Sequence, residues 1–131
     1  MTAEASHFLA KARRFLAHAD IMLYVGSSEM AARAASLADL HAAQAFLFER
    51  VGSIYKTHRR VHAAFLRLSK DEPRIGVARR RLFSRAYTLR LVADFETGAG
   101  AAIPPVRAEV ALENAKRFVR LIEGLIPQTP P

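Results

Sequence analysis

The sequence predicts an all-α fold, an up-and-down bundle of four long helices plus one short helix. Apolar residues recur at three- and four-residue steps along most of the chain, and short segments with glycine or proline separate these periodic stretches. No segment shows the two-residue alternation of a half-buried strand. The 131 residues suffice for one hydrophobic core, so we expect a single helical domain over residues 1–126 and a proline-rich tail over 127–131.

The first two helices should be long and joined by a tight turn. An apolar stripe over residues 8–23 predicts a helix over about residues 4–24. Gly26 interrupts the pattern, and the two serines that follow it can cap a second helix, expected over about residues 29–51. That helix should stop at Gly52.

Three further helices follow, and the first of them is short. Thr57 is a suitable N-cap for a helix over about residues 58–69. Pro73 disfavours helical geometry in the residue before it and should separate this helix from the next, over about residues 74–95. After the loop GAGAAIPP, Pro105 suits the first turn of a last helix with its own apolar stripe.

Positive charge is concentrated in one segment. The net charge is +8, but the segment from Lys56 to Arg90 alone carries +9, and the rest of the chain carries −1. A concentrated basic field favours polyanions, nucleic acid first, because phosphates neutralise it and release counterions. The alternative is a solvated helix surface without a ligand. The candidate phosphate contacts are Lys56, Arg59, Arg79, Arg80, Arg81 and Arg85.

Composition excludes several kinds of site. The chain has no cysteine, which rules out a disulfide framework, a thiolate metal site and a cysteine nucleophile. His58 and His62 have the spacing of two helical zinc ligands, but Arg59 and Arg60 between them oppose a metal ion, so we expect no metal and no cofactor. No signal peptide and no membrane-length apolar run is visible, so we expect a cytoplasmic protein without membrane association.

Four short motifs occur in an order that resembles the small bacterial and archaeal HEPN proteins, a family named for nucleotide binding in higher eukaryotes and prokaryotes. They are HAAQAFLFERVG (41–52), KTHRRVHAAF (56–65), LRLVADF (89–95) and ALENAKRFVRLIEGL (111–125). The resemblance implies a helical bundle that forms a homodimer. It also implies kinship with RNA-cleaving toxins and RNA-binding modules, some of them encoded beside a nucleotidyltransferase-like partner.

The resemblance also directs attention to Arg90. The nucleases of the family pair an arginine near this position with a histidine four to six residues later, and none of the seven residues after Arg90 is a histidine. RNA cleavage without a metal needs a group that takes the 2′-hydroxyl proton and a donor that stabilises phosphate charge. Asp94 lies one helical turn after Arg90, and we expect the two to form an ion pair within the helix. The candidate catalytic residues are Arg90, Asp94 and His58.

Three functions remain open at this point. The first is a HEPN-like protein that binds RNA or a nucleotide-related partner through its basic segment, as a toxin–antitoxin-type component. The second is a structural or interaction bundle with no nucleic-acid role, whose basic face docks an acidic protein. The third is a metal-independent ribonuclease that uses Arg90 with Asp94 or His58. We expect His41, among apolar residues at helical steps, to be a packing residue of the core.

Overall fold

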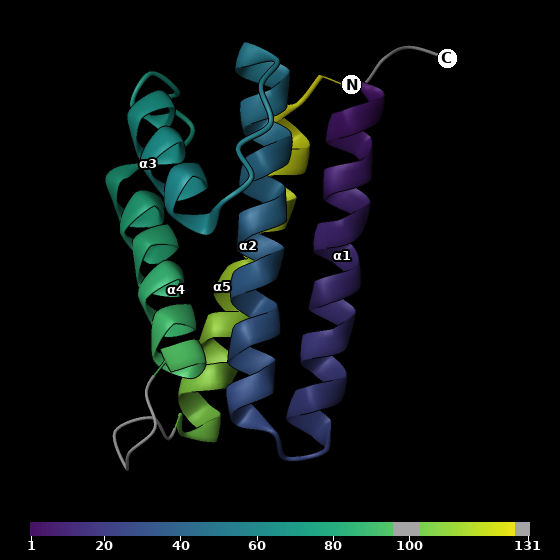
Figure 1. Ribbon diagram of the computed structural model, residues 1–131, viewed down its shortest axis with the longest axis vertical. Helices are drawn as coiled ribbons and strands as arrows, with labels where there is room; N and C mark the ends of the chain where they lie inside the picture. The colour runs from purple at the N-terminus through teal and green to yellow at the C-terminus, as the bar shows by residue number, and fades with distance from the viewer. Residues whose placement is uncertain (96–102, 128–131) are drawn as a thin grey trace.

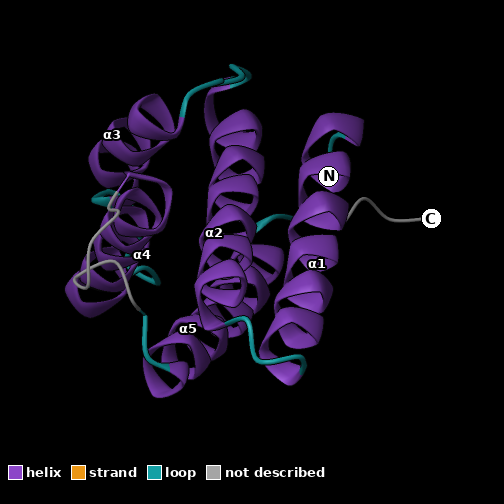
Figure 2. Cartoon of the chain, turned by 60° about the horizontal axis from the view of Figure 1, so that its bottom comes forward, coloured by secondary structure: helices purple, strands orange, loops and turns teal. Residues whose placement is uncertain are grey.

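The all-α prediction is confirmed by the computed structural model, which describes residues 1–95 and 103–127, apart from the side chain of Phe95 (Figures 1 and 2). The motif residue Phe95 and the tail therefore fall largely outside the described residues. Within them, the chain forms five α-helices and no strand, and no helix is long and apolar enough to cross a membrane. The helices are α1 (Ala3–Tyr24), α2 (Ser28–Val51), α3 (His58–Ser69), α4 (Val77–Phe95) and α5 (Pro105–Leu125).

The caps of α2 and α3 differ in how well the sequence predicted them. The hydroxyl of Thr57 accepts a hydrogen bond from the Arg60 amide at 3.2 Å, as expected of an N-cap. Ser27 stands at the N-cap of α2 but makes no side-chain cap. Ser28 instead donates its hydroxyl to the carbonyl of Ile103, at 2.6 Å, so it links α2 to the segment before α5.

Helix α4 begins three residues later than the sequence predicted, at Val77. The buried carboxylate of Glu72 holds the preceding turn, because it accepts hydrogen bonds from the amide of Arg74 at 3.1 Å and from its Nε at 2.9 Å. Arg50, on α2, donates to the same carboxylate, and the Ile75 amide closes the turn on the Glu72 carbonyl. These bonds hold the segment around residues 72–76 in a turn, so the helix begins only after it.

Helix α2 is the centre of the bundle. Figure 1 shows α1 beside it on one side and the α3–α4 pair on the other, and α2 contacts all four other helices. Alanines make the α1 side close-packed, since Ala5, Ala12 and Ala19 are fully buried at seven-residue steps along α1. The whole stretch of α2 from Ala31 to Leu47 is buried except for Arg33 and Leu37.

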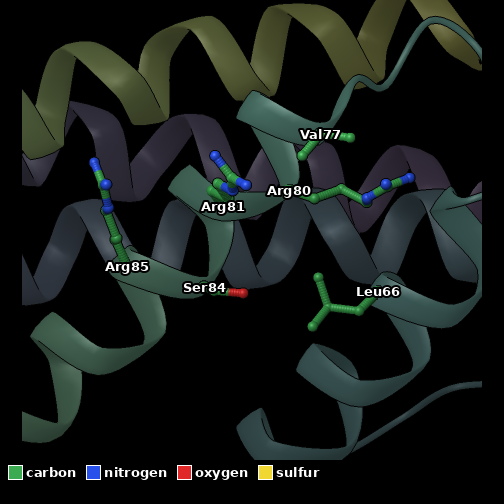
Figure 3. A pocket seen from close by; sticks show the side chains of 6 residues that line it. All are labelled: Leu66, Val77, Arg80, Arg81, Ser84 and Arg85. Atoms are coloured by element: carbon green, nitrogen blue, oxygen red, sulfur yellow. The ribbon is translucent and has the colours of Figure 1, made fainter.

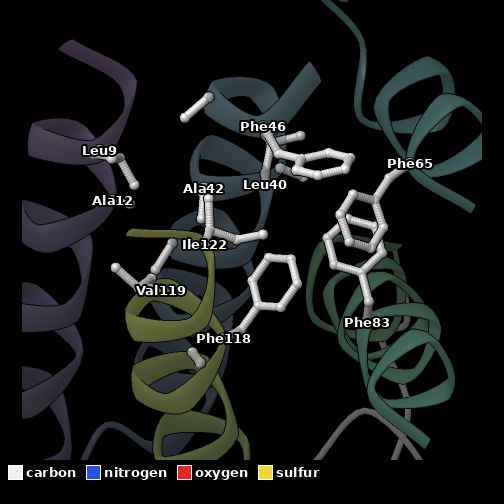
Figure 4. Packing of buried hydrophobic residues seen from close by; sticks show 14 of the residues in the cluster. Leu9, Ala12, Leu40, Ala42, Phe46, Phe65, Phe83, Phe118, Val119 and Ile122 are labelled. Atoms are coloured by element: carbon white, nitrogen blue, oxygen red, sulfur yellow. The ribbon is translucent and has the colours of Figure 1, made fainter. Parts of the chain in front are cut away.

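Phenylalanine rings fasten the α3–α4 pair to the rest of the bundle (Figure 4). Phe65 of α3 and Phe83 of α4 have ring centroids 4.5 Å apart, and Phe118 of α5 lies 5.2 Å from Phe83. Phe46 of α2 meets Phe65 edge-on at 5.5 Å. Such pairs add specific ring contacts to the burial of large apolar surfaces. The basic segment is thereby held at a fixed place on the bundle.

Candidate nucleic-acid interface

A basic groove runs between α3 and α4. It encloses about 340 Å³ and is lined by Leu66 of α3 and by Val77, Arg80, Arg81, Ser84 and Arg85 of α4. Figure 3 shows the three guanidinium groups extending from α4 in different directions rather than toward one another. In the described part of the chain, none of the three forms an ion pair with an acidic side chain. The groove therefore presents positive charge that no carboxylate of the described chain neutralises.

The basic surface continues along α3. A second depression, at the start of this helix, is lined by Thr57, Arg59, Arg60 and Ala63. Arg59, Ala63 and Leu66 lie at steps of four and three residues and share one face of α3, so this depression extends toward the groove. Lys56 is exposed just before the helix. We call the residues Lys56, Arg59, Arg80, Arg81 and Arg85 the basic face.

Arg79 does not belong to the basic face. Its Nη1 atom is buried and has no hydrogen-bond partner, and the side chain borders a small space shared with Asp39 and Asn114. The reason is helical geometry, because successive residues are rotated by about 100° and Arg79 points roughly opposite to Arg81. Of the six sequence candidates for RNA contact, Arg79 is thus the one that faces the interior.

The three candidate catalytic residues lie together at the other end of α4. Arg90 Nε donates to Asp94 Oδ2 at 3.2 Å, so the expected ion pair is present. Arg90 Nη1 lies 2.6 Å from His58 Nδ1, across the gap to α3. Arg33 of α2 donates from Nε to Asp94 Oδ1 at 2.9 Å. One carboxylate therefore joins two arginines, and one of these arginines holds a histidine.

The arginine fixes the protonation state of His58. A guanidinium only donates hydrogen bonds, so Nδ1 must accept, and the neutral ring carries its proton on Nε2. Burial, and next the charge of Arg90, lowers the pKa of His58 to about 4. At neutral pH the ring is therefore uncharged and has an Nε2–H to donate. An imidazole with so low a pKa is a weak base.

Aromatic and histidine rings pack in a row beside this cluster. The Tyr87 ring stacks on His62 with centroids 4.6 Å apart and lies 4.8 Å from His58. His62 Nε2 pairs with the Ser84 hydroxyl at 2.9 Å, and burial lowers the pKa of His62. Because Ser84 also lines the basic groove, this row connects the groove to the Arg90 cluster.

Sequence reasoning missed Arg33. It lies 61 residues before Asp94 and belongs to a segment, MAARAAS, that reads as a core helix. A single cation in such an apolar stretch was the available signal, since a charge on a buried helix needs a partner.

His41 behaves as predicted. It is 8% exposed, pairs with Gln44 through Nδ1 at 2.7 Å and stacks on Phe15.

Comparison with known proteins identifies a family and a solved structure with a similar fold. The family model described as HEPN domain matches residues 5–125. Among solved structures, the chain is similar to the crystal structure of TT1696 from Thermus thermophilus, with a TM-score of 0.76 and 23% sequence identity. The alignment covers 94% of this chain and 98% of that one. At this identity the likeness concerns the fold alone. No curated protein matches the chain.

Proposed function

The chain belongs to the HEPN domain family, and from this premise we propose that it binds single-stranded RNA through the basic face of α3 and α4. We propose further that it does so as a cytoplasmic homodimer and as a toxin–antitoxin-type component with a nucleotidyltransferase-like partner.

The groove between α3 and α4 carries this proposal. Arg80, Arg81 and Arg85 line one depression, and none of them pairs with a carboxylate of residues 1–95 or 103–127. Three like charges that line one depression reinforce one another in a positive field that a single exposed arginine does not create. Phosphates can supply the missing negative charge, and release of their counterions drives the binding. Leu66 and Val77 add apolar surface on which bases can rest.

Salt titration with a labelled single-stranded RNA tests the proposal. Fluorescence anisotropy should show an affinity that falls steeply with salt, with a slope of about 0.7 per phosphate contact. The double variant Arg80→Glu/Arg81→Glu should reduce the slope by about 1.4 and weaken binding at least about tenfold at low salt.

A matched control separates a local contact from net charge. Arg14 and Arg120 are exposed on α1 and α5, and neither has an ion-pair partner in the described chain. Arg14→Glu/Arg120→Glu changes the net charge by the same amount and should leave the slope unchanged. If wild-type protein fails to bind RNA at low salt, or if both double variants lower the slope equally, the proposal is wrong. The first outcome would favour an interaction bundle that docks an acidic protein.

A second candidate function, metal-independent RNA cleavage, is favoured by one distance. Arg90 Nη1 and His58 Nδ1 are 2.6 Å apart, so α3 supplies the histidine that is missing after Arg90 in the sequence. A base role would require Nδ1 to leave Arg90, and the low pKa of His58 makes the ring a poor proton acceptor. We therefore expect wild-type protein to leave RNA intact in a chelator. Cleavage that His58→Gln abolishes would establish the ribonuclease instead.

The proposed homodimer has support in exposed apolar side chains. Ile21, Tyr24, Val25 and Met30 gather around the turn between α1 and α2, and Tyr24 is 91% exposed. Large exposed apolar side chains close together along the chain are candidates for an interface. Light scattering at micromolar concentration should give twice the chain mass, and Tyr24→Glu should shift it toward the monomer. A monomer mass for wild-type protein would contradict the dimer.

A further inference from the structure

A separate pocket lies where α2, α4 and α5 meet. It encloses about 110 Å³, and we call it the junction pocket. Asp39 of α2 and Asn114 of α5 supply polar groups, Arg85 of α4 and Arg107 of α5 supply positive charge, and apolar side chains that include Leu89 and Val110 complete the lining. Of the residues that line it, only Arg85 takes part in the function proposed above.

Asp39 is the unusual member of this lining. It is 6% exposed, and no described residue donates a hydrogen bond to its carboxylate. Burial raises the pKa of Asp39 well above its ordinary value, while the charge of Arg79 acts in the opposite direction. Yet no ion pair joins these two residues. Asp39 lines the pocket and has no protein donor among the described residues, so its carboxyl oxygens can accept hydrogen bonds from a ligand that enters there.

The other polar groups of the junction pocket also lack a partner among the described residues. Arg85 and Arg107 are exposed and form no ion pair with described residues, and the side-chain amide of Asn114 makes no hydrogen bond to them. The deep end of the pocket thus offers the Asp39 carboxyl and the Asn114 amide as acceptors, with the buried Arg79 guanidinium beyond them, whereas the guanidinium groups nearer the solvent attract an anion. A simple anion would leave Asp39 without a donor, and a simple amine would leave both arginines without a partner.

We propose that the junction pocket binds a small aliphatic amino acid in its zwitterionic form. The ammonium group donates to Asp39 and to the side-chain oxygen of Asn114, and the carboxylate lies between Arg85 and Arg107. The aliphatic side chain packs against Leu89 and Val110. The pocket is small, at about 110 Å³, which suits a compact ligand rather than a large one. This site does not require RNA binding, although it shares Arg85 with the basic face.

Titration with L-valine tests the proposal in the absence of RNA. Two-dimensional NMR of the labelled full-length protein should show saturable shifts at Leu89, Val110 and Asn114. N-acetyl-L-valine lacks the ammonium group and L-valine methyl ester lacks the carboxylate, so each should bind at least tenfold more weakly. Absence of saturable shifts with valine, or equal binding of N-acetyl-L-valine, would overturn the proposal.

Three variants assign the contacts. Asp39→Asn keeps the shape of the side chain but removes its charge, and it should abolish valine binding while the rest of the spectrum stays folded. Arg107→Gln alters an exposed side chain without affecting the core and should weaken binding at least tenfold. Arg81→Gln lies outside the junction pocket and should bind valine as the wild type does. Unchanged binding in both Asp39→Asn and Arg107→Gln would refute the site, whatever the RNA titrations show.

Discussion

The two halves of α4 use arginine in opposite ways. In the first half, Arg80, Arg81 and Arg85 line an open groove and have no acidic partner within the described parts of the chain. In the second half, Arg90 is joined to Asp94 and His58, and its side chain is only 22% exposed. The difference lies in the neighbours, because only Arg90 has a carboxylate one turn further along the helix. An arginine with such a partner links helices, and an arginine without one remains able to bind a ligand.

The largest effect should come from removing the carboxylate that makes the second half different. Asp94→Ala removes the carboxylate that pairs with both Arg33 and Arg90, so Arg90 keeps only its contact with His58, in a place where the aspartate side chain is 20% exposed. We expect the free energy of unfolding to fall by about 2 kcal/mol, between the values typical of exposed and buried pairs. Urea denaturation measures it. Asp20→Ala, which removes the exposed pair with Lys116, should cost under about 1 kcal/mol. Equal losses in the two variants would show that Asp94 is an ordinary surface residue.

A paired substitution tests the arginines themselves. Arg90→Gln should lower the free energy of unfolding by about 1–2 kcal/mol, because it breaks bonds to two other side chains. Arg81→Gln should change it by less than about 0.5 kcal/mol. RNA affinity should respond in the reverse order, with the salt slope lowered by Arg81→Gln and retained by Arg90→Gln. The comparison of the two halves fails if both variants have the same effect on stability.

Asp94→Asn separates charge from shape in the same cluster. The amide is nearly isosteric but lacks the charge that joins two guanidinium groups, so stability should fall by about 1 kcal/mol. Thermal unfolding measures this loss, and an RNA incubation with a chelator accompanies it. We expect no cleavage by the wild type or the variant. If the wild type cuts RNA and Asp94→Asn loses that activity at an unchanged melting temperature, then Asp94 is catalytic rather than structural.

The effect that is smallest at neutral pH is the dependence of stability on pH, which develops only as the pH falls below about 6.5. His58 has a pKa of about 4 in the folded chain, against 6.5 for a free histidine. Above pH 6.5 both states are neutral, whereas between 6.5 and 4 only the unfolded chain takes up the proton, so stability is lost as the pH falls through this range. The pKa values of His41 and His62 are also lowered, so both residues add to the loss of stability as the pH falls. His58→Gln should therefore flatten, without abolishing, the fall in melting temperature.

The exposed His7 provides the control for this measurement. His7→Gln removes a histidine without touching the Arg90 cluster and should leave the pH dependence as it is in the wild type. A pH profile that His58→Gln does not change would mean that solvent reaches the ring more freely than its contacts with Arg90 and Tyr87 indicate.

Local sequence patterns predicted the helices, but they did not predict the side-chain contacts that form the site. Thr57 and Pro105 mark the starts of α3 and α5 because caps and first turns depend on adjacent residues. The start of α4 was wrong because Arg50, 22 residues earlier, helps to hold Glu72. The Arg90–Asp94 pair followed from its spacing, whereas the contact with His58, 32 residues away, depends on how α3 packs beside α4. Arg79 looked like its neighbours in the sequence, and only the packing of the helix shows that it faces inward.

Because the helices differ in how much of their surface is buried, they should open locally at different free energies. Helix α2 is buried over most of its length, whereas α4 buries only Phe83 and Leu89 among its described side chains. Amide protons of α3 and α4 should therefore exchange with deuterium sooner than those of α2, because the region with fewer buried contacts opens at a lower free energy. The basic face thus belongs to the part of the fold that opens most readily. A ligand bound there would slow exchange in both helices together, so the rate would report occupancy without any label on the ligand.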